Sequence, residues 1–141
     1  MSLATLRIVF AVILIAHGIG HYMGVLSSFN VKMSPSQSST SKLLDPLLGE
    51  SFSRVLCFVL HLLPLVGFLA AGWALLGWLV PQDWWIPLAV ISAVLSMLAL
   101  VFYWNGLAFA FNKVGAVLVN LAVLICLLLL KWPPGLINRA S

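Results

Sequence analysis

The feature that most constrains this chain is a series of four long apolar stretches, which cover about residues 6–26, 52–80, 84–104 and 114–131. A membrane-spanning helix needs about 20 apolar residues at a rise of roughly 1.5 Å each, and every stretch is close to that length or longer. Within a bilayer the backbone polar groups must be bonded inside the segment, which favours helices over an open sheet. We therefore predict an all-α fold, an integral membrane bundle of four transmembrane helices.

Composition agrees with this class. Hydrophobic residues make up 63% of the 141 residues and charged residues only 7%, which excludes an ordinary water-soluble globule. The length predicts a single membrane domain, residues 1–141. The net charge of +4 comes from seven lysines and arginines near the ends of the apolar stretches, which indicates a lipid bilayer as the partner and no nucleic acid. We expect the first stretch to be retained as a helix, although it resembles a signal peptide.

The segment between the first two stretches, residues 27–51, is polar and rich in serine. Pro35 and Pro46 interrupt helix there, so we expect a mobile loop with a short interfacial helix around residues 43–49. This is the one loop long enough to act as a lid. The other two connections are short turns.

Aromatic residues divide between the two ends of the predicted bundle, as is typical of membrane interfaces. The group on the side of both termini is Trp78, Trp84, Trp85 and Trp132. The group on the side of the long loop is Tyr22, Tyr103 and Trp104. Lysines and arginines occur on both sides, so the positive-inside rule does not decide the orientation.

The first stretch contains an unusual motif, ILIAHGIGHYMG at residues 13–24, in which glycines separate two histidines. At about 100° per residue, one helical face carries His17, Gly20, His21 and Gly24, and the other faces are apolar. Gly20 and Gly24 form a G-x-x-x-G pair, which lets a neighbouring helix approach closely. We therefore predict that this face is turned toward the bundle and carries both histidines inward.

The second stretch carries a histidine at a matching height. His17 lies nine residues before Leu26, and His61 lies nine residues after Phe52 on a helix that runs in the opposite direction. Both residues are therefore expected roughly 14 Å below the same membrane surface. Asn120 falls at a similar depth. The polar side chains of the spans thus gather in the half of the bundle beneath the long loop.

An ionisable side chain inside a membrane is costly, so these residues are candidates for a functional site. Histidines at i and i+4 of a helix can share one transition metal ion, and the predicted metal ligands are His17, His21, Cys57 and His61. A haem or chlorin needs axial histidines on opposite faces of the ring, a role open to His17 and His61. A quinone or similar lipid-soluble ligand can be hydrogen-bonded in an apolar cleft, here by His17, His61 and Asn120.

Less specific roles stay open for the same residues. Neutral His, Ser and Asn side chains also form hydrogen bonds between helices, a role that stays open for His17 and His61 and is the simpler interpretation for Asn120 and Ser96. His21 lies near the expected interface beside Tyr22, where contact with water or lipid headgroups is the simpler interpretation.

Catalysis has less support than binding. The acidic residues all lie outside the apolar stretches, at Asp45, Glu50 and Asp83. No buried carboxylate is therefore expected to act as a general base. Glu50 and Arg54, at i and i+4, predict a surface ion pair at the start of the second helix.

The chain resembles small four-span bacterial membrane proteins grouped as DoxX-like, in particular a set with an HG-x-x-H motif late in the first span. The residues that carry the resemblance are His17, Gly18 and His21, then Trp84 and Trp85, then the run from Trp104 to Lys113 with Gly115 and Asn120. The resemblance implies a four-helix fold in the bacterial inner membrane. DoxX-like proteins are associated with respiratory and sulfur redox complexes, which implies a redox-linked or accessory-subunit role.

Together these observations predict a ligand-binding or accessory subunit of a redox membrane system, in which His17 and His61 contact a cofactor, a metal or a quinone-like ligand. One alternative is a structural subunit of a larger membrane complex or a homo-oligomer, with no cofactor of its own. Another is a small membrane enzyme that acts on a lipid-like substrate.

Overall fold

The computed structural model describes residues 2–133 and is all-α within that range. Its helices are α1 (Leu3–Gly20), α2 (Tyr22–Ser28), α3 (Asp45–Leu48), α4 (Glu50–Leu76), α5 (Trp85–Phe102) and α6 (Ala110–Leu124), with short helical turns η1 (Gln82–Trp84) and η2 (Trp104–Gly106) and a π-helical turn at Ile125–Leu129. Four segments are long and apolar enough to cross a membrane: Leu3–Ser28, Glu50–Leu76, Gln82–Phe102 and Ala110–Leu129. The four-span prediction is confirmed.

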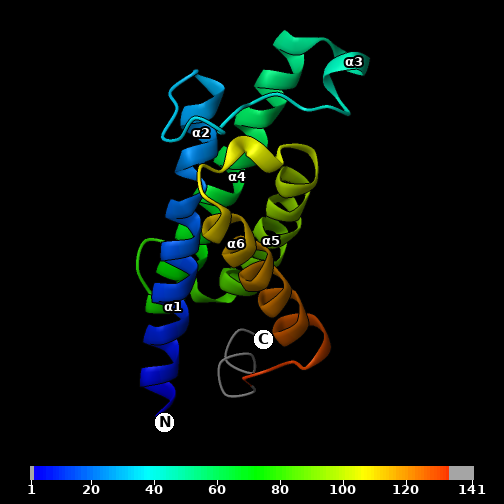
Figure 1. Ribbon diagram of the computed structural model, residues 1–141. Helices are drawn as coiled ribbons and strands as arrows, with labels where there is room; N and C mark the ends of the chain where they lie inside the picture. The colour runs from blue at the N-terminus through cyan, green and yellow to red at the C-terminus, as the bar shows by residue number, and fades with distance from the viewer. Residues whose placement is uncertain (1, 134–141) are drawn as a thin grey trace.

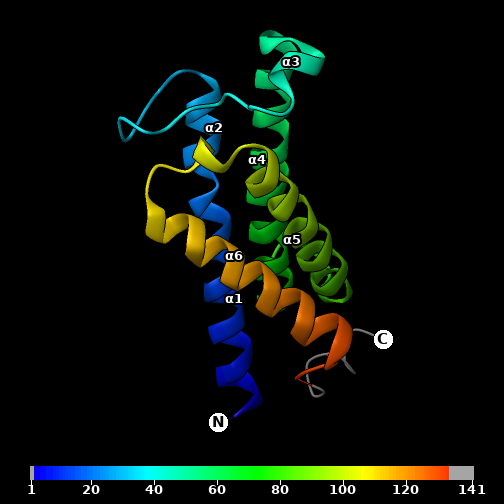
Figure 2. The same ribbon diagram turned by 45° about the vertical axis from the view of Figure 1, so that its right-hand side comes forward.

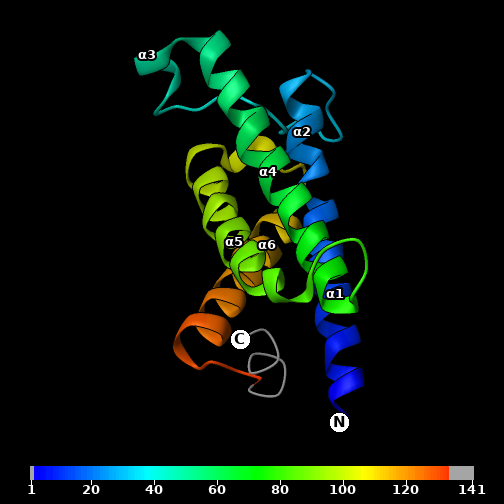
Figure 3. The same ribbon diagram turned by 180° about the vertical axis from the view of Figure 1, so that it is seen from behind.

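The long helix α4 packs against α1 and α2 on one side and against α5 on the other (Figures 1 and 3). Helix α6 packs on α5 and crosses α1 obliquely (Figure 2). The start of α1 lies at the opposite end of the molecule from α3 (Figure 1). Because α6 crosses α1 at an angle, the two helices touch near one level and diverge from it, and this crossing shapes the site described below.

The first span is bent at His21. Helix α1 ends at Gly20 and α2 begins at Tyr22, and the backbone N–H of His21 bonds to Gly18 O at 3.0 Å in a tightened turn. The sequence predicted one continuous helix over residues 6–26.

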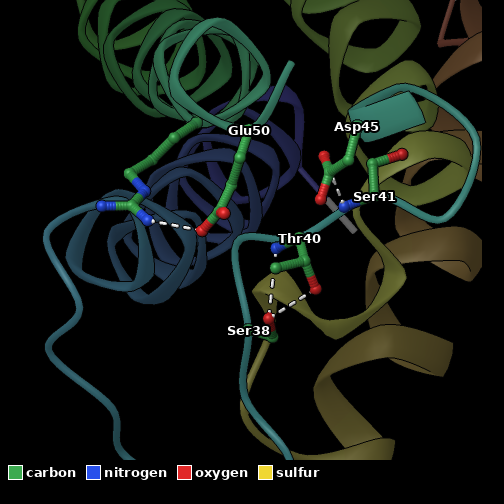
Figure 4. Close-up of polar contacts among 6 residues, drawn as sticks. Ser38, Thr40, Ser41, Asp45 and Glu50 are labelled. Carbon is green, nitrogen blue, oxygen red and sulfur yellow. Dashed lines mark hydrogen bonds and ion pairs between the residues drawn. The ribbon is translucent and has the colours of Figure 1, made fainter. Parts of the chain in front are cut away.

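Helix α4 is the longest element and ends earlier than the predicted residue 80. Gly77 adopts a φ of +72°, the left-handed conformation that commonly ends a helix, and α4 stops at Leu76. At its start, Arg54 Nη2 lies 2.9 Å from Glu50 Oε1 (Figure 4). This confirms the predicted surface ion pair.

The half of the bundle nearer the start of α1 has an apolar core rich in alanine. We call it the apolar half, and its buried residues are Ala11, Leu14, Phe68, Ala71, Ala74, Leu75, Trp85, Ala89, Ala93, Val123 and Leu127. Small side chains let the helices approach closely, the main way in which helices associate in lipid. A Cβ atom at Gly72 would lie 3.1 Å from Ala11 O, for example.

The aromatic groups fit membrane interfaces only in part. Tyr22, Trp78, Trp84 and Trp104 are exposed, as predicted. Trp85 is 0% exposed within the apolar half, and Tyr103 is 0% exposed with its hydroxyl donating to Ser53 O at 2.7 Å. The interfacial prediction is therefore wrong for these two side chains, because the helix faces that carry them are turned into the bundle.

The serine-rich connection, residues 29–44, is fastened to the bundle, where the sequence predicted a mobile loop. Gln37 is 1% exposed and donates from Nε2 to Met23 O at 2.7 Å and to Gly106 O at 2.9 Å. The backbone N–H of Met33 donates to Gln37 Oε1 at 2.6 Å. The backbone N–H of Ser38 also donates to Asn105 O at 2.8 Å, so Gln37 and Ser38 together tie the loop to α2 and η2.

The second part of the connection forms local turns before α3 (Figure 4). The backbone N–H of Thr40 donates to Ser38 Oγ at 3.1 Å, and that of Ser41 donates to Asp45 Oδ1 at 3.0 Å. Asp45 then begins α3, which confirms the short helix predicted around residues 43–49.

Candidate functional site

Three histidines cluster beneath the fastened loop, and His21 lies at their centre. Its ring centroid is 5.4 Å from that of His17 and 5.7 Å from that of His61. Phe68 packs edge-on against His17 at 4.6 Å. His21 is 1% exposed, so the prediction that it contacts water or headgroups is wrong. The loop and η2 cover this end of the bundle and separate His21 from the interface.

A chain of hydrogen bonds links these rings to α5 and α6. His17 Nε2 lies 2.9 Å from Asn120 Oδ1, Asn120 Nδ2 donates to Ser96 Oγ at 2.6 Å, and Ser96 Oγ lies 2.9 Å from His21 Nε2. Asn120 and Ser96 are fully buried. The structure therefore brings His17 and Asn120 together as the sequence predicted, and it joins His17 to Asn120 rather than to His61.

The partners assign the protons in this chain. Asn120 Oδ1 can only accept, so His17 donates from Nε2 and its Nδ1 is an acceptor. Ser96 accepts from Asn120, and His21 Nε2 is the acceptor next to the Ser96 hydroxyl. This pairing uses the His21 tautomer that carries its proton on Nδ1. That atom is buried and has no hydrogen-bond partner among residues 2–133.

His61 lies apart from this chain. Its Nδ1 donates to Cys57 O at 2.9 Å, which leaves Nε2 as a buried acceptor without a partner in the described part of the chain. A Cβ atom at Gly24 would collide with the His61 ring, and one at Gly106 would lie 2.9 Å from its Cε1. Two glycines thus make room for this one imidazole.

The G-x-x-x-G prediction holds for one of its two glycines. Gly24 packs against His61, and Gly18 approaches α4 closely, since a Cβ there would lie 3.0 Å from Leu65 O. A Cβ at Gly20 would meet no atom within 4 Å. Gly20 therefore borders open space rather than a neighbouring helix.

The predicted metal ligands His17, His21, Cys57 and His61 do not form one site. Among residues 2–133, no group of three His, Cys, Asp or Glu side chains is arranged to hold a metal ion. Cys57 Sγ lies 3.7 Å from His61 Nδ1, but that nitrogen donates to a backbone carbonyl. Helical spacing predicted that His17 and His21 share one face of the first helix and that Cys57 and His61 share one face of the second. In the structure His17 bonds to Asn120 on α6, so the two pairs do not meet around one point.

A haem or chlorin held between His17 and His61 does not fit this arrangement either. His17 uses Nε2 to bond Asn120, and His61 has its ring packed against Gly24 and Gly106. The ring of His21 contacts both of the other histidines. A macrocycle needs a free plane between two axial nitrogens, and these contacts occupy it.

A cavity of about 400 Å³ opens between α1 and α6 beside this cluster. Its polar lining residues are His17, His21 and Asn112, and the remainder are Ile13, Ala16, Gly20, Leu107, Phe111, Gly115, Ala116 and Val119. Two of its lining residues, Ile13 and Phe111, are 44% and 74% exposed on helices long and apolar enough to cross a membrane, so part of the cavity wall lies on the surface expected to contact lipid. His61 and Asn120 are not among the lining residues.

A second cavity of about 330 Å³ continues along the same helix pair and is almost entirely apolar. It shares Ile13 and Val119 with the first cavity, and its other lining residues are Phe10, Leu14, Leu118, Ala122, Val123 and Cys126. The two cavities together offer a polar compartment and an apolar extension.

Asn112 is the site residue that sequence reasoning missed. Its Nδ2 donates to Met23 Sδ at 3.2 Å, and its Oδ1 is buried without a partner within the described range. A signal for it was present in the sequence. Asn112, Gly115, Ala116 and Val119 recur at i, i+3, i+4 and i+7, the spacing of one helical face with small residues around an amide.

Comparison with protein-family models, curated proteins and solved structures finds no match to this chain. The DoxX-like resemblance therefore stays a prediction, and the proposal below depends mainly on the geometry of the cavities.

Proposed function

We propose that this protein binds a lipid-soluble molecule with a small, oxygen-bearing head and an apolar tail, of the quinone type. The observation that carries the proposal is the pair of adjacent cavities between α1 and α6, of which the first has His17, His21 and Asn112 in its lining and the second is lined by apolar residues. The head lies in the first cavity and the tail follows the second.

The size and chemistry of the first cavity suit such a head. Small-molecule sites are commonly about 300–1,000 Å³, mainly apolar, with a few polar groups that fix orientation. Two buried polar atoms of the lining residues, His21 Nδ1 and Asn112 Oδ1, have no partner within residues 2–133. Each of these atoms exposes less than 1 Å² in the free protein, so a head group pairs with them only after the lining side chains shift, and it then removes a cost of about 1–3 kcal/mol for a buried polar group without a partner.

The place of this activity follows from the resemblance and the spans. We propose a ligand-binding or accessory subunit of a redox membrane system in the bacterial inner membrane. In this role the chain holds a mobile, lipid-soluble carrier beside its partner subunits. Entry from the bilayer is possible because the exposed Ile13 and Phe111 form part of the cavity wall.

The test is thermal unfolding of the purified protein in detergent, with and without a ubiquinone that carries a decyl tail. A ligand at 100 times its Kd stabilises the folded protein by about 2.7 kcal/mol, which corresponds to a rise in Tm of several degrees. Gly20→Leu fills the cavity and should abolish this rise with little change in Tm of the free protein, because a Cβ at Gly20 meets no atom within 4 Å.

Val101→Leu is the matched control, because Val101 is 67% exposed on α5 and lies outside both cavities. It should keep the full ligand-dependent rise. A wild-type protein that shows no rise, or a rise that Gly20→Leu leaves intact, would contradict the proposal.

A second candidate function is supported by the hydrogen-bond chain itself. His17, Asn120, Ser96 and His21 connect three helices, which is sufficient for a structural subunit whose histidines only hold the bundle together. Under this alternative, His17→Ala lowers Tm by the same amount with and without the quinone.

A further inference from the structure

The polar atoms of the first cavity distinguish between ligands that donate a hydrogen bond and ligands that only accept one. The inference drawn from them rests on the proposed function and concerns the chemical form of the head group.

The hydrogen-bond chain makes His21 a donor toward the ligand. Asn120 Nδ2 donates to Ser96 Oγ at 2.6 Å, and among residues 2–133 the Ser96 hydroxyl has no acceptor for its own proton other than His21 Nε2, at 2.9 Å. A neutral imidazole carries one proton, which is then on Nδ1. His21 lines the cavity with this N–H buried and without a partner in the described chain.

Asn112, in contrast, is an acceptor toward the ligand. Its Nδ2 donates to Met23 Sδ at 3.2 Å, a contact that fixes which end of the amide is the oxygen. Oδ1, an acceptor, is left buried without a partner in the described residues. His17 adds a second acceptor to the cavity wall, because its Nε2 proton goes to Asn120 Oδ1.

A quinone can form hydrogen bonds with only some of these polar atoms. Its oxygens accept hydrogen bonds, so they can pair with His21 Nδ1–H but offer no proton to Asn112 Oδ1 or His17 Nδ1. A hydroxyl group both donates and accepts. We infer that the site binds the hydroxylated form of its ligand, a quinol or a related phenol, in preference to the quinone.

The size of the preference follows from the cost of an unpaired acceptor. A site built to hydrogen-bond a hydroxyl rejects the analogue that lacks the proton, because its own buried polar group is left unpaired. The quinol should bind roughly tenfold to a hundredfold more tightly than the quinone.

The experiment compares dissociation constants, by calorimetric titration in detergent under anaerobic conditions, for decyl-ubiquinol, decyl-ubiquinone and the dimethyl ether of the quinol. The ether has the shape of the quinol and no donor. We expect tight binding of the quinol and weak binding of both other compounds.

Two variants assign the preference to Asn112. Asn112→Leu removes the acceptor and should bring the quinol-to-quinone ratio close to one, whereas Asn112→Asp keeps an acceptor and should keep the preference. Thermal unfolding of the free variants verifies that both are folded. The three-ligand comparison on the unmodified protein decides the inference even where a variant does not fold.

The possible failures are distinct. Equal binding of quinol and quinone, both abolished by Gly20→Leu, overturns the inference and leaves the proposed function intact. A preference that survives Asn112→Leu overturns the role of Asn112. No binding of any of the three compounds overturns both the inference and the proposed function.

Discussion

The two halves of this bundle use small residues for different purposes. In the apolar half, alanines and Gly72 bring α1, α4 and α5 together around large side chains such as Phe68 and Leu75. Beneath the fastened loop, Gly24 and Gly106 instead make room for the ring of His61, and Gly20 borders a cavity. Close packing stabilises the apolar half, whereas the half beneath the loop is less closely packed and contains polar groups and a cavity.

The largest effect is expected from a cavity made in the apolar half. Leu75 is 0% exposed, and Leu75→Ala should lower the free energy of unfolding by about 2–5 kcal/mol. Reversible unfolding in mixed detergent micelles measures this quantity. Leu98→Ala, at a position 40% exposed on α5, is the control and should cost far less. Similar losses for the two variants would show that the apolar half is not held by close packing.

A smaller effect is expected where a glycine accommodates a histidine. Gly24→Ala places a methyl group against the His61 ring and should cost about 1–3 kcal/mol through overpacking. Gly20→Ala, four residues earlier at the end of α1, should be nearly neutral because its Cβ meets open space. The same unfolding assay applies. A double variant, Gly24→Ala with His61→Ala, should recover part of the loss, and the contact is misassigned if it recovers none.

The polar chain should contribute less than either of these packing effects. Asn120→Leu leaves His17 Nε2 and Ser96 Oγ without their partner and should cost about 1–2 kcal/mol. A double-mutant cycle with His17→Ala isolates the pairwise term, expected at about 1 kcal/mol. A coupling energy of zero would mean that the bond between the two side chains contributes nothing to the bundle.

The smallest effect on global stability is expected in the loop. Gln37→Ala removes two hydrogen bonds from the loop to the bundle and one within the loop, and it should accelerate tryptic cleavage after Lys32 and Lys42, with a change in Tm of only a few degrees or less. Ser36→Ala, at an exposed loop position, should leave the cleavage rate unchanged. Equal cleavage rates in the two variants would show that Gln37 does not hold the loop.

Much of the fold could be predicted because the bilayer imposes it. The four spans, the Glu50–Arg54 pair and the short helix near Asp45 follow from local hydropathy and spacing. The fastened loop did not, because Gln37, Ser34 and the backbone N–H of Ser38 reach backbone carbonyls far along the chain, and no local pattern marks such contacts.

The candidate site could be predicted in part. Helical spacing and depth placed His17 and Asn120 near each other, which the structure confirms at 2.9 Å. The same reasoning could not foresee that His61 is excluded from the cavity, because its ring is packed against Gly24 and Gly106, a contact that helical spacing does not reveal. Asn112 was missed because it lies near the start of the fourth span, and only the small residues on its own helix face mark it as part of a cavity.

The fit of one imidazole against two glycines has a consequence for evolution. A methyl group at position 24 collides with the histidine ring at position 61, and one at position 106 would lie 2.9 Å from that ring. Orthologous chains should therefore inherit the three identities as a linked set, and a lineage that loses the ring at 61 frees both glycines to drift.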